Sequence, residues 1–154
     1  MTLIKSISGI RGTIGGLPGD NLTPIDVVKF TSAYARWVKE SVQRNEYRIV
    51  LGRDARISGP MIQKLVAASL QGCGIHVIDL GLATTPTTEM AVTGLNAQGG
   101  IILTASHNPA QWNALKLLNE KGEFLTAADG ERILELVEKE NVNYAAYDQL
   151  GGYT

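Results

Sequence analysis

The sequence has few cysteine and histidine residues, which form the disulfides and zinc sites that stabilise many small folds. It holds one cysteine, Cys73, and 2 histidines in 154 residues. A lone cysteine cannot form an internal disulfide, and one thiol with two imidazoles is a meagre ligand set for zinc. These shortages exclude a secreted disulfide scaffold and argue against a Cys/His zinc module.

Long apolar runs and an excess of either charge are also missing. No stretch approaches the roughly 20 apolar residues that span a bilayer, and residues 1–10 lack the apolar core of a signal peptide. The 14 Lys and Arg nearly balance 15 Asp and Glu, for a formal charge of -1, whereas nucleic-acid and membrane-surface proteins favour a basic excess. We therefore expect no nucleic-acid partner, no membrane partner and a cytoplasmic location.

What remains is typical of one globular domain. Hydrophobic residues make up 44% of the chain and charged residues 19%. Glycine is abundant, with 17 residues, and it falls in short clusters where turns are expected. No repeat, linker or low-complexity tract divides the chain, whose length is close to the common size of a single domain.

Apolar patterns alternate between strand-like and helix-like segments. Strands are predicted at residues 3–10, 48–51, 75–80, 100–104 and 114–118. Helices are predicted at residues 24–44 behind the cap Thr23, from 58–60 to about 72, at 85–95, and after the cap Thr126. This alternation predicts an α/β fold, a three-layer α/β/α sandwich with a mixed, largely parallel sheet.

Ligands of such sheets bind beyond the carboxyl ends of the strands, which here lead into residues 52–56, 81–85 and 105–109. The G-x-x-x-x-G-K-[ST], G-x-G-x-x-G and G-x-S-x-G motifs are all absent. A serine hydrolase built on Ser106 is therefore a weak hypothesis, since the adjacent His107 is badly placed to deprotonate its neighbour.

One loop is chemically unusual, with the sequence Thr104-Ala105-Ser106-His107-Asn108-Pro109. It follows a buried strand and places one hydroxyl amid donors suited to a phosphate. A plain Ser/Asn turn that ends the strand is the alternative interpretation.

This loop, followed by Asn113 and Lys116, resembles the active-site serine loop of the α-D-phosphohexomutases, which include phosphoglucomutase, phosphomannomutase and phosphoglucosamine mutase. Two more segments are similar to motifs of that family and stand in the family's order. They are Ser8-Gly9-Ile10-Arg11-Gly12 and Gly52-Arg53-Asp54-Ala55-Arg56-Ile57-Ser58-Gly59.

The resemblance implies that Ser106 is phosphorylated and interconverts hexose 1-phosphate and hexose 6-phosphate through a bisphosphorylated sugar. It implies Lys116 as general acid/base, Arg11 and His107 as assisting donors, and Mg²⁺ bound in part through the phosphate on Ser106. Positioning and positive charge matter most in phosphoryl transfer, which agrees with such a set. The residues expected to bind phosphate or substrate are Ser8, Arg11, Arg53, Arg56, Asn108 and Asn113.

Two hypotheses stay open for the Arg53, Asp54 and Arg56 cluster. It is either an ion-pair cluster that shapes the loop or a cationic wall beside the phosphoserine. Ala114 stands where the family often has glycine, so an ordinary backbone conformation is expected there.

The resemblance covers only the first of the family's four domains, and the aspartate-rich metal loop of relatives is absent. We expect residues 1–140 to form domain I, with the serine loop at 104–109, and residues 141–154 to be a tail or the start of a connection to a second domain. The other domains would be its partners, and the chain alone is expected to be inactive as a mutase. The alternative is a non-catalytic module that binds phosphate or sugar phosphate.

Overall fold

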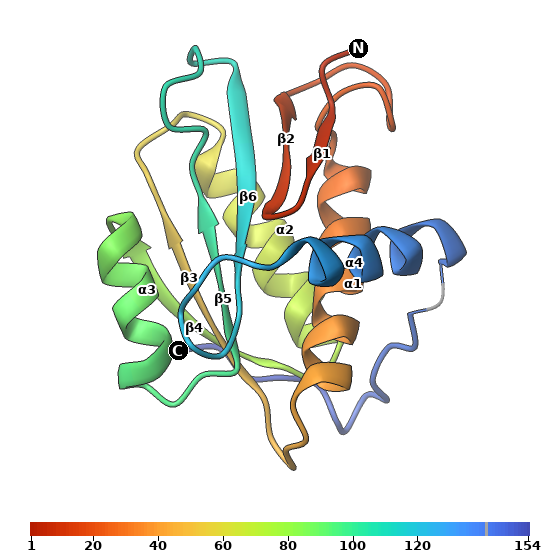
Figure 1. Cartoon of the computed structure of the whole chain (residues 1–154), viewed down its shortest axis with the longest axis vertical. Helices are drawn as coiled ribbons and strands as arrows, with labels where there is room; N and C mark the ends of the chain where they lie inside the picture. The colour runs from red at the N-terminus through yellow and green to blue at the C-terminus, as the bar shows by residue number, and fades with distance from the viewer. Residues whose placement is uncertain (141) are drawn as a thin grey trace.

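The computed structural model describes residues 1–140 and 142–154, within which six strands and four helices form three layers (Figure 1). The strands are β1 (Ile4–Ser6), β2 (Gly9–Thr13), β3 (Arg48–Arg53), β4 (His76–Leu82), β5 (Gly99–Leu103) and β6 (Trp112–Leu118). The helices are α1 (Pro24–Ser41), α2 (Gly59–Gly72), α3 (Thr85–Gly94) and α4 (Ala127–Lys139). The strand order across the sheet is β1-β2-β6-β5-β3-β4.

Each face of the sheet has its own apolar core. Helices α1, α2 and α4 cover one face and α3 covers the other (Figure 1). Successive side chains of a strand point to opposite faces, so in β5 Ile101 and Leu103 join the core under the three helices, while Ile102 packs under α3. The predicted α/β/α sandwich is confirmed.

Parallel pairing is confined to one half of the mixed sheet. β3 pairs parallel with both β4 and β5, whereas β5 with β6, β6 with β2 and β2 with β1 are antiparallel. Helices α2 and α3 return the chain between the parallel strands, but residues 104–111 join β5 to β6 without a helix, which permits antiparallel pairing. The mixed sheet is confirmed, but the expectation that it is largely parallel is wrong, because only the two pairings within β4-β3-β5 are parallel and the other three are antiparallel.

The strand predicted at residues 3–10 is wrong, because this segment is a hairpin. It contains all of β1, a turn at Ile7 and Ser8, and the start of β2. Gly9 follows the turn at a φ of 146°, a conformation that residues with a side chain rarely adopt. The turn lacks the Asn-Gly or Asp-Gly pair that marks a tight hairpin in a sequence.

The predicted caps of α1 and α4 are confirmed as capping boxes. The Thr23 side chain accepts from the Asp26 N–H, and the Asp26 carboxylate accepts from the Thr23 N–H at 3.0 Å. Thr126 and Asp129 repeat the arrangement at α4. These reciprocal bonds satisfy donors that a helix start leaves unpaired, which is why both helices begin where the sequence predicts.

The last residues of the chain cover the outer edge of β4. Val77 donates its N–H to the Gly152 carbonyl at 3.0 Å and accepts from the Thr154 N–H at 2.9 Å. Tyr153 lies opposite Val77 in a parallel bridge. The segment thereby pairs backbone groups that an edge strand would otherwise expose.

Tyr34, fully buried in α1, ties that helix to two strands. Its hydroxyl lies 2.6 Å from the Leu118 carbonyl and accepts from the Gly100 N–H at 2.9 Å. Burial raises the pKa of Tyr34 far above its ordinary value. We expect Tyr34→Phe to lower the free energy of unfolding by about 1–3 kcal/mol, because buried backbone groups lose their partner.

Urea denaturation measures this loss. Tyr47→Phe is the matched control, since the Tyr47 hydroxyl bonds the Val42 carbonyl at 2.7 Å in a half-buried position where water can replace it. Equal losses of unfolding free energy in the two variants would contradict the importance assigned to the buried hydrogen bonds of Tyr34.

Candidate active site

The three predicted loops meet at the carboxyl end of the parallel strands. The loops after β3 and β5 lie side by side at the top of Figure 1, and the Ala83 N–H of the loop after β4 donates to the Arg53 carbonyl at 3.1 Å. Because β3 and β5 are parallel, their carboxyl ends meet at the same edge. The Asp54 N–H donates to the Leu103 carbonyl at 3.1 Å, and the Thr104 hydroxyl donates to the Asp54 carboxylate at 2.7 Å. The fold thereby places the Gly52–Gly59 motif beside the serine loop.

Ser106 is exposed at the outer part of its loop. Its φ of 52° lies in the left-handed region, which is uncommon for a residue other than glycine. Its N–H donates to the Thr104 hydroxyl at 3.2 Å. Backbone strain of this kind concentrates at functional sites, so Ser106 is a strong candidate for a reacting group.

Lys116 reaches Ser106 from the neighbouring strand β6. Its Nζ donates to Ser106 Oγ at 2.6 Å. Lys116 is half-buried and lies opposite Gly9 of β2 on one side and Ile102 of β5 on the other. The structure therefore brings together the two residues that the sequence singled out most strongly.

Arg11 lies on the same sheet face as Lys116. In the β2–β6 register Gly9 is opposite Lys116 and Arg11 is opposite Ala114, so the two cations are diagonal neighbours. A hollow of about 170 Å³ beside them is lined by Ser6, Ser8, Gly9, Ile10, Arg11, Ala114, Leu115 and Lys116. Ala114 is an ordinary strand residue, as expected.

The hollow combines two cations with two hydroxyl side chains, Ser6 and Ser8, and none of the described residues that line it is a carboxylate. Such a set can bind an anion with oxygen acceptors. Lys116 connects the hollow to the serine loop, because it lines the hollow and its ammonium contacts Ser106.

The other predicted phosphate ligands behave differently. Arg53 donates to Gln63 Oε1 at 2.7 Å and to the Asp54 carbonyl at 3.2 Å. Arg56 pairs with Asp54 at 3.3 Å, and only 12% of its side chain is exposed. Of the two hypotheses for this cluster, the geometry favours the ion-pair cluster that shapes the loop.

Asn113 is fully buried, and its amide donates to Ser58 Oγ at 2.9 Å. The prediction that Asn113 offers its amide to a phosphate is therefore not supported, because no surface of the side chain faces solvent. His107 is exposed and Asn108 half-buried in the loop, and the Asn108 N–H donates to the Ala105 carbonyl at 3.0 Å.

The sequence analysis did not predict a chain of hydrogen bonds that runs from Arg53 through Gln63 and Asp79 to Tyr153. Gln63 of α2 donates to the Asp79 carboxylate of β4, which also accepts from the Tyr153 hydroxyl. This bond raises the pKa of Tyr153. The available signal was a lone glutamine on the otherwise apolar start of α2.

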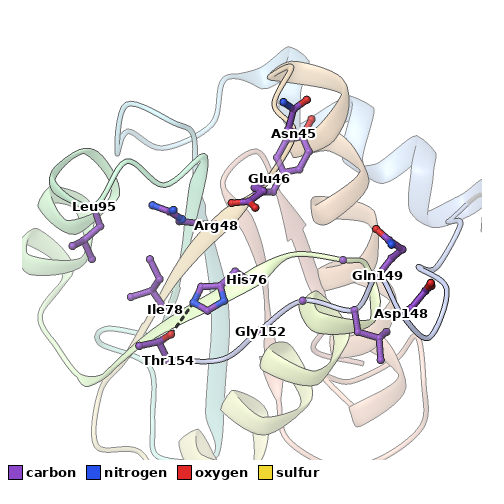
Figure 2. Close-up of a pocket in the computed structure, with 14 residues that line it drawn as sticks. Asn45, Glu46, Arg48, His76, Ile78, Leu95, Asp148, Gln149, Gly152 and Thr154 are labelled. Atoms are coloured by element: carbon purple, nitrogen blue, oxygen red, sulfur yellow. Dashed lines mark hydrogen bonds between the residues drawn. The ribbon is translucent and has the colours of Figure 1, made fainter.

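A second, larger hollow lies at the opposite edge of the sheet, where β3 and β4 begin, and has a volume of about 690 Å³ (Figure 2). His76 lines it, and its Nε2 lies 2.8 Å from the Thr154 hydroxyl (Figure 2). His76 is thus a bonded edge histidine, far from the serine loop.

Within residues 1–140 and 142–154 there is no group of three or more His, Cys, Asp or Glu side chains that could hold a metal ion. In the same part of the chain, no helix has both the length and the apolarity that a bilayer crossing requires.

The family model for "Phosphoglucomutase/phosphomannomutase, alpha/beta/alpha domain I" matches residues 3–143. Similar proteins include a phosphoglucomutase/phosphomannomutase of Thermococcus kodakarensis, 34% identical over 91% of this chain and 31% of the relative. A phosphoglucosamine mutase of Acinetobacter baumannii is 33% identical over 86% of this chain and 29% of the relative. The chain thus spans less than a third of the length of these two relatives.

Solved structures agree with the fold. A phosphoglucomutase/phosphomannomutase family protein from Burkholderia thailandensis superposes with a TM-score of 0.80 at 22% identity, over 98% of this chain and 32% of that one. A protein from Thermus thermophilus gives 0.78 at 28% identity, over 99% of this chain and 33% of that one. The matched motifs, the three-layer architecture and the family match all agree, and the chain belongs to the phosphoglucomutase/phosphomannomutase family as its α/β/α domain I.

Proposed function

We propose that this chain is the phosphoserine domain of a phosphohexomutase, with Ser106 as the residue that carries the phosphoryl group. One observation carries the proposal, the 2.6 Å bond from Lys116 Nζ to the Oγ of an exposed serine in a left-handed conformation. An ammonium so close stabilises negative charge on that oxygen and can exchange a proton with it.

The proposed step is a transfer between two oxygens. A hexose hydroxyl attacks the phosphorus of phosphorylated Ser106, a new P–O bond forms to the sugar, and the bond from phosphorus to Oγ breaks. Lys116 gives its proton to the leaving Oγ and is reprotonated by the proton that the sugar hydroxyl releases. The reverse step loads Ser106 from a bisphosphorylated hexose, with Lys116 accepting the serine proton.

Arg11 has the supporting role in this proposal. Arg11 lines the same hollow as Lys116, and a guanidinium can bind phosphate oxygens in a fork. Ser8 lines the same hollow and adds a neutral donor. Phosphoryl transfer has a charge-spread transition state, so fixed donors of this kind contribute more than a strong base.

The proposal includes Mg²⁺ bound to phosphorylated Ser106, but the described residues do not by themselves make a metal site. The Asp54 carboxylate, which reaches the serine loop, already accepts from Thr104 and Arg56. Mg²⁺ prefers six oxygen ligands, so Ser106 and its phosphate would supply a minority. The remaining domains of the enzyme are the proposed partners, and a hexose phosphate is the proposed substrate.

Intact-mass measurement after incubation with a hexose 1,6-bisphosphate tests the proposal. The wild-type chain should gain one phosphoryl group, and Ser106→Ala should gain none. Ser41→Ala, which alters an exposed serine at the end of α1, is the matched control and should be modified like the wild type.

No phosphoryl gain in the wild type would overturn the transfer role. Saturable binding of the bisphosphate without modification would instead support the non-catalytic binding module. The 154-residue chain by itself should show no turnover of hexose 1-phosphate, and measured turnover would refute our expectation that other domains are required.

A further inference from the structure

The serine loop needs an external support, because its own bonds are few and its central residue is strained. Within the loop, the Asn108 N–H donates to the Ala105 carbonyl and the Trp112 N–H donates to the Pro109 carbonyl, both at 3.0 Å. Ser106 nevertheless keeps a left-handed φ of 52°, a state that persists only where the surroundings impose it.

The carbonyl oxygens of this loop converge on a single side chain from another loop. Arg56 Nη1 donates to the Pro109 carbonyl at 2.7 Å and to the Trp112 carbonyl at 3.0 Å. Arg56 Nη2 donates to the Ser106 carbonyl at 3.1 Å and to the Asn108 carbonyl at 2.8 Å. Four backbone acceptors along seven residues of chain thus share one guanidinium.

The fifth donor of Arg56 fixes the guanidinium itself. Arg56 Nε lies 3.3 Å from Asp54 Oδ2, and the Arg56 N–H donates to Asp54 Oδ1 at 3.1 Å. Asp54 in turn accepts from the Thr104 hydroxyl at 2.7 Å. The guanidinium is therefore anchored, through Asp54, to the residue that follows β5.

A guanidinium has five N–H donors, and all five of Arg56 are used within the protein. With only 12% of its side chain exposed, Arg56 has no donor left for a phosphate oxygen. Arg11 differs, since its side chain is exposed and borders the hollow beside Lys116. The two arginines therefore have different tasks.

We propose that Arg56 is a positioning residue that holds the backbone of residues 106–112 through its carbonyl oxygens and so keeps Ser106 Oγ against Lys116 Nζ. The clamp itself follows from the contacts alone. Its consequence for phosphoryl transfer rests on the function proposed above.

The variants Arg56→Lys and Arg56→Gln distinguish a role in holding the loop backbone from a role that needs only the positive charge. Lysine keeps the positive charge but has three donors at one point, so it cannot bond four spread carbonyls. A clamp predicts that Arg56→Lys fails nearly as badly as Arg56→Gln. A phosphate ligand or a general electrostatic role predicts that Arg56→Lys retains most of the function.

Amide hydrogen exchange tests the clamp without any substrate. In both variants the amides of Asn108 and Trp112 should exchange at least about tenfold faster than in the wild type, because the loop opens more often. The amides of β5 should stay protected, which shows that the fold is intact. Arg48→Gln removes an exposed arginine at the far end of β3 and should change neither set.

Transfer kinetics test the consequence. In Arg56→Lys the maximal rate of Ser106 phosphorylation by hexose 1,6-bisphosphate should fall about tenfold or more, with the half-saturating concentration within about twofold of the wild type. A rise in the half-saturating concentration at an unchanged maximal rate would overturn the proposal, because it would make Arg56 a ligand.

Unchanged loop exchange in Arg56→Gln, or loop exchange in Arg56→Lys equal to that of the wild type, would also overturn the clamp. If both variants lose protection in β5, Asp54→Asn provides the test, since it keeps Arg56 but removes its anchor. Faster exchange at Asn108 with β5 intact would then support the clamp, and wild-type exchange would contradict it. If the wild type is never phosphorylated, the proposed function fails while the exchange result still decides the clamp.

Discussion

Replacing Lys116 with methionine should slow phosphorylation of Ser106 by about 10³-fold, within the range that loss of a general acid/base group produces. Methionine keeps much of the apolar stem but removes the ammonium that lies 2.6 Å from Ser106 Oγ. The oxygen then loses both its proton partner and the nearest positive charge, at the point where negative charge develops in the transfer. The effect should be on the maximal rate, since the substrate keeps its contacts with Arg11.

Time-resolved intact-mass measurement of the chain with a hexose 1,6-bisphosphate gives this rate. Lys64→Met, which changes an exposed lysine of α2, is the matched control and should phosphorylate at the wild-type rate. Lys116→Arg keeps the charge but holds its proton too tightly for exchange, so it should stay far below the wild type. A rate for Lys116→Met within about threefold of the wild type would contradict the assigned role.

Gly9→Ala should be the most damaging single-methyl change near the site, lowering the free energy of unfolding by about 3–5 kcal/mol. A Cβ built at Gly9 would lie 1.9 Å from the Leu115 carbonyl oxygen, and the backbone φ of 146° is unsuited to an L side chain. The clash falls within the β2–β6 pairing, directly opposite Lys116. Relief therefore requires that the two strands separate where Gly9 pairs with Lys116.

Urea denaturation of Gly9→Ala and Gly15→Ala separates the clash from the backbone strain. Gly15 also has a positive φ, 104°, but nothing lies within 4 Å of a Cβ built there. Its alanine variant should lose only about 1–2 kcal/mol, the strain alone. Equal losses in the two variants would show that the strands yield to the methyl group without cost.

Several parts of the fold follow from residues that are neighbours in the chain. The Thr23–Asp26 and Thr126–Asp129 pairs are three residues apart, and each starts its helix as predicted. The apolar run at Gly99–Leu103 is wholly buried, as a strand covered on both faces must be. The Ser106 hydroxyl is likewise visible in the sequence of the loop at residues 104–109, although its part in phosphoryl transfer is an inference.

Other features could not be predicted because they depend on contacts between distant segments. Asn113 carries the same amide whether exposed or buried, and only the tertiary structure shows that it is buried and bonded to Ser58, 55 residues away. The hairpin at residues 4–13 was missed because its turn lacks the usual signature, while β6 supplies the partner strand that holds β2 in the sheet.

The sequence by itself determined the alternation of strands and helices and the helix starts, because periodicity and capping are properties of a few adjacent residues. The role of Ser106 came from the resemblance of its loop to the phosphohexomutases and remains a proposal. Only the tertiary structure decided that three of the five strand pairings are antiparallel, that Lys116 Nζ lies within hydrogen-bond distance of Ser106 Oγ, and that Arg56 uses all its donors on the loop and its anchor. Those outcomes depend on strand register and on the direction of side chains from distant segments. Arg56 and Ser106, for example, are 50 residues apart in the sequence. Local preferences do not determine which distant groups come into contact.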